Sequence, residues 1–120
     1  MNNQDLEKVR LLTEYLITLG FQKNTAKILA YLHYNPDRTA MDIEFDMEMR
    51  QPEVSGALQY CLKKNWIKDR KEKRESKGRP MKIHRLNKSI KEIVEEYIIE
   101  LPENDQIKNT EIFEKIRELS

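Results

Sequence analysis

Hydrophobic residues recur at helical spacing along most of the chain, and one polar stretch interrupts them. The first predicted helix has an apolar side made of Leu6, Val9, Leu12, Leu16 and Leu19, with Asp5 as its N-cap and Gly20 after its last turn. Leu11, Tyr15 and Ile17 widen this side. Core packing alone accounts for so broad a stripe, and so does core packing combined with a subunit contact.

Two further helices are predicted before residue 50. The first is capped by Asn24 or Thr25 and ends at the turn Asn35-Pro36-Asp37. The second opens at Thr39, with Asp42 three residues later as the partner in a capping box. Its acids stand at alternate positions, which a helix spreads around its axis, so we expect a solvated acidic face rather than a metal site. These acids are Asp42, Glu44, Asp46 and Glu48.

Residues 51–64 form a predicted helix with one apolar and one polar side. Gln51-Pro52 opens it, since proline fits the first helical position. Val54, Leu58, Cys61 and Leu62 repeat as one buried face. The other face has no bulk at Gly56, and a glycine within a helix costs about 1 kcal/mol relative to alanine. The lack of a side chain at Gly56 allows another surface, such as a DNA backbone, to come close to the helix.

A basic hairpin is predicted directly after this helix. Trp66-Ile67 begins one strand, Met81 to Leu86 forms the other, and Lys77-Gly78-Arg79-Pro80 makes the tip. From Lys63 to Lys88 the chain has 12 Lys or Arg and 3 Asp or Glu, a net charge of +9. The whole chain has a net charge of only +1, so positive charge is gathered in one segment. Such segregation is typical of a surface that meets a polyanion, although a merely solvated charge run is the alternative.

The C-terminal part is predicted to be helical to its end. Ser89 caps a helix that stops at Pro102, and residues 104–119 carry Ile112, Phe113, Ile116 and Leu119 at helical spacing. We divide the chain into a DNA-binding domain at 1–101 and a helical extension at 102–120. The extension is expected to contact a second subunit, and packing back on its own domain is the alternative. The expected dimer contacts are Leu12, Leu16, Ile93, Tyr97, Ile98, Ile112, Phe113 and Ile116.

Composition excludes several classes of protein. No apolar run approaches the length of a membrane span, and the N-terminus lacks the pattern of a signal peptide, so a cytoplasmic location is the expectation. Cys61 lies on the predicted core face, and His33 and His84 are far apart, which does not suit a metal site. No nucleophile–base pair, phosphate loop or glycine-rich cofactor turn is present. We therefore expect no enzyme, no cofactor and no bound metal.

The order of these segments resembles small prokaryotic winged helix–turn–helix transcription regulators of the TrmB-like and MarR-like groups, with ArsR-like regulators as relatives. The residues that carry the resemblance are Thr39 to Ile43, Arg50 to Ser55, Leu62 to Ile67, Lys77 to Pro80 and Ile83 to Leu86. It implies a mainly α fold with a small β-hairpin wing (α+β), with dimerisation helices at the N- and C-termini. It covers residues 21–101 well and the ends loosely.

The resemblance also implies which residues contact double-stranded DNA. On the recognition helix they are Arg50, Gln51, Pro52, Glu53, Ser55, Gly56, Gln59 and Lys63. On the wing they are Lys71, Lys73, Arg74, Lys77, Gly78 and Arg79. Gln51 suits adenine, and Arg79 stands where a wing arginine enters the minor groove. Glu53 departs from the resemblance, because it places an acid on the face of the helix that is expected to contact DNA.

The expected function is that of a homodimeric repressor that binds a pseudo-palindromic operator through helix 51–64 and wing 68–85. Two alternatives stay open: a winged helix that binds another protein, and an architectural protein that binds DNA without sequence preference. The sequence does not reveal the operator, the regulated genes or whether a small-molecule effector exists.

Overall fold

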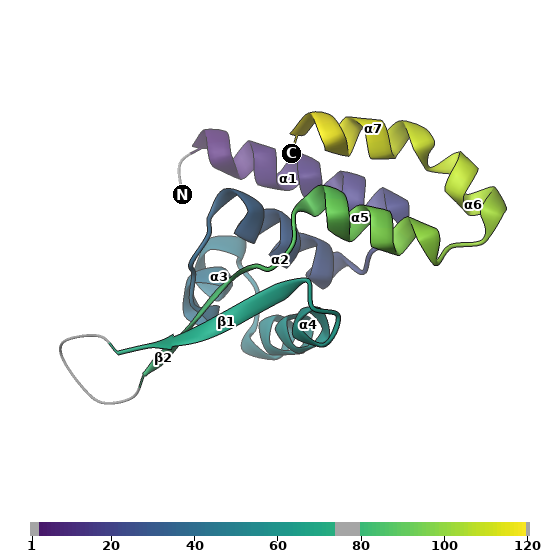
Figure 1. Cartoon of the computed structure of the whole chain (residues 1–120). Coiled ribbons are helices and arrows are strands. Elements are labelled where there is room, and N and C mark those ends of the chain that lie inside the picture. Colours follow the sequence, from purple (N-terminus) through teal and green to yellow (C-terminus); the bar gives the residue numbers. More distant parts are fainter. Residues whose placement is uncertain (1–2, 74–79, 120) are drawn as a thin grey trace.

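The computed structural model describes residues 3–73 and 80–119. The elements in chain order are α1 (Asn3–Leu19), α2 (Lys23–Tyr34), α3 (Ala40–Met47), α4 (Gln51–Lys63), β1 (Ile67–Glu72), β2 (Met81–Leu86), α5 (Ile90–Ile99), α6 (Glu103–Lys108) and α7 (Thr110–Leu119). β1 and β2 pair antiparallel and lead away from the helical body (Figure 1). The predicted class, mainly helical with one two-stranded hairpin, is confirmed.

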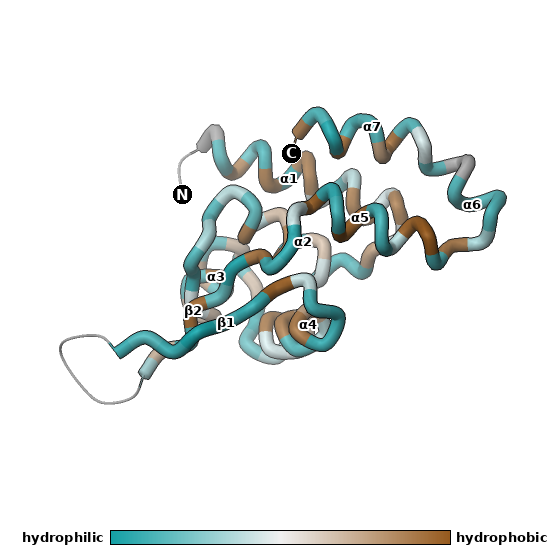
Figure 2. Tube along the Cα trace, viewed as in Figure 1, coloured by the Kyte–Doolittle hydropathy of each residue, from teal (hydrophilic) through white to brown (hydrophobic). Residues whose placement is uncertain are grey.

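One hydrophobic core joins the helices. Val9, Leu12, Leu16 and Leu19 of α1 are buried, as the spacing predicted, whereas Leu11 and Ile17 are 38% and 40% exposed. The hairpin contributes less: Ile67 is the only buried residue of β1, and Ile83 and His84 are the buried residues of β2. Figure 2 shows this difference, since hydrophobic and hydrophilic stretches alternate along the helices while β1 is hydrophilic beyond its start. β1 is therefore exposed beyond its first residue, while β2 is also held to the body through its middle residues.

Two helix starts test the capping predictions. α3 has the predicted capping box: the Asp42 N–H donates to the Thr39 hydroxyl over 3.1 Å, and the Thr39 N–H donates to the Asp42 carboxylate over 3.0 Å. The cap predicted for α2 is wrong, because that helix begins at Lys23 with Gln22 as its N-cap. Thr25 lies inside the helix and is buried, so its side chain packs in the core and does not cap.

A cluster of aromatic rings connects α5 to α4. Phe21 stacks on Tyr97 of α5 with ring centroids 4.2 Å apart, and it also lies 5.6 Å from Trp66. Trp66 meets Tyr60 of α4 edge to face at 5.8 Å. The chain reaches Phe21 through Gly20, whose φ of 117° is costly for any residue with a Cβ. A Cβ at Gly20 would also collide with the Tyr97 hydroxyl.

The C-terminal segment differs from the prediction in two ways. It forms α6 and α7 instead of one helix, and α7 packs along α1 of the same chain (Figure 1). Ile116 is fully buried in this contact and belongs to the main core cluster. In the single chain, then, the last helix packs back on its own domain, which was the alternative expectation.

This packing corrects half of the residues predicted as dimer contacts. Leu12, Leu16, Ile93 and Ile116 are each 0% exposed in the single chain, so their side chains stabilise the core of one subunit. The helical spacing identified them correctly as apolar, but it does not say which apolar face meets the chain's own core. Tyr97, Ile98, Ile112 and Phe113 are half-buried and keep some surface for a partner.

Candidate nucleic-acid interface

The candidate interface is built on α4, which is fixed to the body through one side. Val54, Ala57, Leu58 and Cys61 are buried there, and α4 contacts both α2 and α3. The chain turns from α3 into α4 within residues 48–50, where Glu48 has a φ of 51° and Met49 is buried. This arrangement is a helix–turn–helix with α4 as its second helix.

The opposite side of α4 is open to solvent, as predicted. All eight residues proposed to contact DNA from this helix are exposed: Arg50, Gln51, Pro52, Glu53, Ser55, Gly56, Gln59 and Lys63. Within the part of the chain that the structure describes, the side chains of Gln51, Ser55 and Gln59 make no hydrogen bond. The donors and acceptors of these three side chains are not used in folding and are free to bind a ligand.

Gly56 lies on this open side with nothing within 4 Å of the place a Cβ would occupy. The packing of this chain therefore does not require glycine there. Because a helical glycine is unfavourable relative to alanine, its presence needs another reason. A closely approaching external surface supplies one.

Glu53 is an acid on the open side with a role in folding. Its carboxylate accepts a hydrogen bond from the Arg50 N–H over 2.9 Å and so satisfies one donor before the first turn of α4. Acidic groups are also favourable near a helix N-terminus. This explains why an acid occurs at the start of a helix that otherwise exposes neutral polar and basic residues.

The hairpin beside α4 is tied to the loop between α2 and α3. Arg38 and His84 exchange two backbone hydrogen bonds, of 3.0 and 2.8 Å, which makes residue 38 a third, one-residue strand next to β2. His84 is 4% exposed, and burial lowers its pKa below the ordinary value. Because it is uncharged near neutral pH, it contributes no positive charge to the wing.

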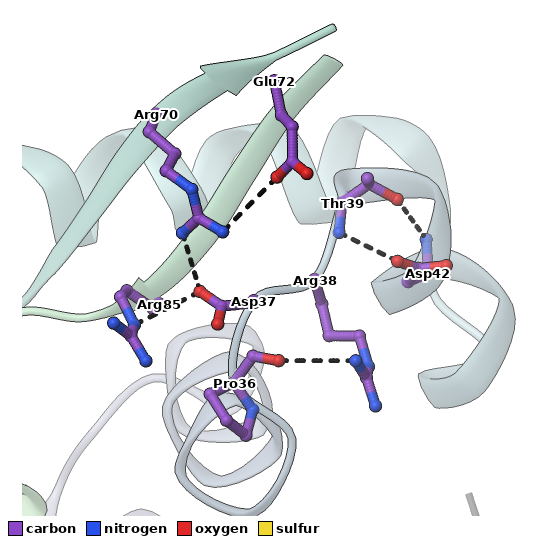
Figure 3. Close-up of polar contacts among 8 residues, drawn as sticks. All are labelled: Pro36, Asp37, Arg38, Thr39, Asp42, Arg70, Glu72 and Arg85. Atoms are coloured by element: carbon purple, nitrogen blue, oxygen red, sulfur yellow. Dashed lines mark hydrogen bonds and ion pairs between the residues drawn. The ribbon is translucent and has the colours of Figure 1, made fainter. Parts of the chain in front are cut away.

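A carboxylate from the same loop binds two wing arginines. Asp37 lies 2.8 Å from Nη1 of Arg70 and 3.2 Å from Nε of Arg85 (Figure 3). Nη2 of Arg70 also lies 3.4 Å from the Glu72 carboxylate. The hydrogen bond from Arg70 lowers the pKa of Asp37, which therefore remains ionised. Asp37 has a positive φ of 60°, a conformation that Asp tolerates better than most residues.

These contacts reduce the positive charge that the basic segment offers. Arg70 and Arg85 share Asp37, and Lys88 pairs with Glu96, which also accepts a hydrogen bond from the Trp66 indole. The predicted net charge of +9 counted only the segment itself, so it missed these two acids from other elements. Among residues 63–73 and 80–88, the exposed cations that form no ion pair with another described residue are Lys63, Lys64, Lys68, Lys71, Lys73 and Lys82.

The structure places the predicted wing residues only in part. Lys71 lies on β1 and Lys73 follows it, both exposed. Arg74, Lys77, Gly78 and Arg79 lie outside the described residues. Sequence analysis missed Lys68 on β1 and Lys82 on β2, which are both exposed. It also missed Asp37, because an acid next to Pro36 in a turn gives no signal that sets it apart.

A groove of about 380 Å³ runs between α3, α4 and the hairpin. Gln51, Ser55 and Gln59 line one side, and Lys82 and His84 line the other. Glu44 and Asp69 also border it, so the groove itself is not strongly positive. The residues expected to read DNA therefore share one surface with the base of the wing.

Other chemistries find little support in the described part of the chain. Cys61 is buried, and burial raises the pKa of its thiol to about 12, which leaves too little thiolate to react. No group of three metal-binding side chains occurs among the described residues. None of the described helices combines the length and hydrophobicity needed to cross a bilayer.

Comparisons with known proteins identify the type of fold. Neither a scan against models of protein families nor a search of curated protein sequences found a match. A solved structure of a transcriptional regulator superposes with a TM-score of 0.59 at 9% identity, covering 97% of this chain and 90% of the other. Apo MarR from E. coli gives a TM-score of 0.54 at 18% identity, covering 89% of this chain and 77% of MarR.

A third solved structure is a MepR mutant from S. aureus bound to an oligodeoxyribonucleotide, with a TM-score of 0.51 at 20% identity, covering 98% of this chain and 93% of that one. The chain has the fold of the MarR-family regulators. The MarR-like part of the predicted resemblance is confirmed at the level of fold, while the TrmB-like and ArsR-like parts stay predictions.

Proposed function

We propose that this protein is a DNA-binding transcription regulator that acts as a homodimer on a pseudo-palindromic operator, most simply as a repressor in the cytoplasm. The observation that carries the proposal is the open side of α4, whose polar groups are unused by folding and lie next to a cationic hairpin. Gln side chains suit adenine, while lysines suit phosphates of any sequence. α4 would supply sequence preference and the hairpin general affinity.

The MarR-like fold supports this use of α4. The MepR mutant, which shares the fold, was solved with an oligodeoxyribonucleotide bound. A second helix of a helix–turn–helix fits the major groove, and two copies would place their α4 helices about 34 Å apart or a multiple of that distance. Gly56 would let the backbone of α4 come close to the duplex.

The proposed dimer uses apolar surface that the single chain leaves uncovered at its C-terminal end. Ile99 of α5 is 74% exposed, and it borders an open groove of about 510 Å³ between α5, α6 and α7. Ile98 and Phe113, two of the predicted dimer contacts, line the same groove. A second copy that packs its own α5 and α7 here would bury these side chains symmetrically.

Selection of bound sites from random duplexes at stated salt, with the protein mass measured alongside, tests the proposal most directly. We expect one enriched sequence with two related halves and the mass of a dimer. Affinity should fall with salt with a log–log slope of about −0.9 for each phosphate contacted. Equal affinity for all duplexes would instead indicate an architectural protein, and no DNA binding would favour a protein partner.

Two substitutions separate the roles of the interface residues. Gln51→Ala should relax the preference at one base pair in each half-site and cost about 1–3 kcal/mol on the selected sequence only. Lys71→Gln should weaken binding to every sequence and reduce the salt slope by about 1. Identical effects of both substitutions on random DNA would refute this division of roles.

A further inference from the structure

The outer face of α3 carries two large apolar side chains that the single chain leaves uncovered. Phe45 is 85% exposed and Met41 is 69% exposed. They are four residues apart in one helix, so they are neighbours on the same face. The inner face packs on the core through the buried Ile43, with Ala40 and Met47 beside it. Phe45 and Met41 therefore lie outside the contacts that hold α3 in place.

This apolar pair has the composition of a surface that binds another protein. Phe and Met are enriched where proteins contact one another, and both side chains have apolar area whose burial is favourable. A Met side chain adapts its shape to a partner, and the face of a Phe ring attracts cations as well as apolar groups. A molecule that covers the pair would gain from both residues.

The charges next to the apolar pair are negative. Glu44 follows Met41 by three residues, and Glu48, at the end of the helix, follows Phe45 by three. Neither carboxylate forms an ion pair with another described residue, and the sequence of α3 contains no Lys or Arg. The other two acids of α3 are used in internal hydrogen bonds. Two free carboxylates thus flank the two exposed apolar side chains.

These charges decide which molecule suits the outer face of α3. A DNA backbone would meet carboxylates of its own sign. A second copy that used the same face would bring Glu44 and Glu48 against their own equivalents, because a two-fold contact pairs a surface with itself. The proposed dimer surface also lies elsewhere, since Figure 1 shows α3 well away from α6. A basic partner is the one that the charges favour.

We propose that Met41, Glu44, Phe45 and Glu48 form a docking face for a basic segment of a partner protein. The segment places an aliphatic side chain against Phe45 and Met41, and Lys or Arg side chains beside the two carboxylates. An Arg can also stack on the exposed Phe45 ring. Because Met41 and Glu44 border the groove beside α4, the docked segment lies next to the candidate nucleic-acid interface. The docking face does not depend on whether the protein binds DNA.

The probe is a synthetic helical peptide with two leucines one turn apart and lysines around them, followed by NMR spectra of the full-length protein. We expect saturable shifts of the backbone amides of residues 41, 44, 45 and 48. Phe45→Ala should weaken peptide binding about tenfold, and Glu48→Gln about two- to fivefold. Because Phe45 is almost fully exposed, its loss leaves the core intact.

The matched controls are an apolar and an acidic residue on the exposed side of α1. Leu11→Ala and Glu7→Gln should leave peptide binding unchanged. A second peptide with glutamates in place of the lysines should bind at least about tenfold more weakly, since it meets carboxylates of its own sign. Equal binding of the two peptides would overturn the choice of a basic partner.

The remaining outcomes test the docking face itself. The absence of saturable shifts overturns it, and so does peptide binding that Phe45→Ala leaves intact. A lower oligomer mass of Phe45→Ala would assign the face to a second copy, and weaker duplex binding by this variant would assign it to DNA. Either result overturns the proposal. A protein that binds the lysine peptide here but no DNA would refute the proposed function and leave the docking face standing.

Discussion

α3 and α4 are adjacent short helices of the same helix–turn–helix, and they use their polar residues in opposite ways. On α3, Asp42 completes the capping box, and Asp46 accepts a 2.5 Å hydrogen bond from the hydroxyl of Tyr31 in α2. On α4, Gln51, Ser55 and Gln59 have no such partners among the described residues. α3 also exposes apolar surface at Met41 and Phe45, whereas α4 exposes mostly polar groups.

The difference separates a helix that builds the fold from one that presents a surface. The carboxylates of α3 hold that helix to its own start and to α2, so their loss should lower stability. The amides and hydroxyl of α4 contribute nothing to internal bonding, so their loss should change binding and little else. The sequence predicted the capping box of α3 and the polar side of α4, but the bond from Tyr31 to Asp46 is seen only in the contacts.

The largest expected effect contrasts the two sides of α4. Leu58→Ala removes a side chain that is 5% exposed and should lower the free energy of unfolding by about 3 kcal/mol, because a cavity remains in the core. Gln59→Ala, one residue later, should change it by less than about 0.5 kcal/mol. Urea denaturation followed by circular dichroism measures both. Similar losses for the two variants would show that the open side of α4 is packed.

Next in size is the bond between α2 and α3. Tyr31→Phe removes the hydroxyl that donates to Asp46 and should cost about 1.5 kcal/mol of unfolding free energy, since the acceptor is charged. Tyr34→Phe is the matched control, because the Tyr34 hydroxyl makes only a long 3.5 Å contact with the Leu119 carbonyl. That control should lose less than about 0.5 kcal/mol. Equal losses of unfolding free energy in the two variants would show that the bond to Asp46 does not fix α3.

A smaller effect tests the helix starts. Thr39→Ala removes the side-chain half of the capping box of α3 and should lower the unfolding free energy by about 1 kcal/mol. Arg50→Ala at the same position of α4 should leave it within about 0.5 kcal/mol, because Arg50 contributes its backbone N–H and not its side chain. Melting temperatures of the two variants give the comparison. A larger loss for Arg50→Ala would contradict the described cap.

The smallest effect has the opposite sign. Gly56→Ala should raise the unfolding free energy by about 0.5–1 kcal/mol, since alanine favours the helix and its Cβ meets nothing. The same variant should bind duplex DNA more weakly if the backbone of α4 approaches the DNA there. Thermal melting and a DNA titration on one preparation test both. A variant that is more stable and binds equally well would show that no surface comes close to Gly56.

Regular periodicity allowed much of the fold to be predicted. The buried face of α4 followed from Val54, Leu58 and Cys61, and β2 was predicted with its observed bounds because Pro80 and the turn residues mark its start. The start of α3 followed from Thr39 and Asp42, whose side chains interact three residues apart. Each of these signals is local, so the sequence contains it directly.

The errors concern contacts between distant segments. Leu12 and Ile116 are more than 100 residues apart and end in one core, and no local pattern shows which apolar face meets which. The charge of the wing was overestimated for the same reason, because Asp37 and Glu96 come from other elements. The likeness in fold identifies the type of architecture, and the individual roles of the interface residues stay predictions.

The collision between residues 20 and 97 has a consequence for how this chain can vary. Gly20 needs both its positive φ and the space beside the Tyr97 hydroxyl, so the two positions form a coupled pair. Removing the hydroxyl, as in Tyr97→Phe, clears the obstruction and keeps the ring stacked on Phe21, yet it leaves the backbone penalty untouched. A double substitution should consequently recover only part of the loss from Gly20→Ala, and mutational drift at position 20 faces two independent barriers.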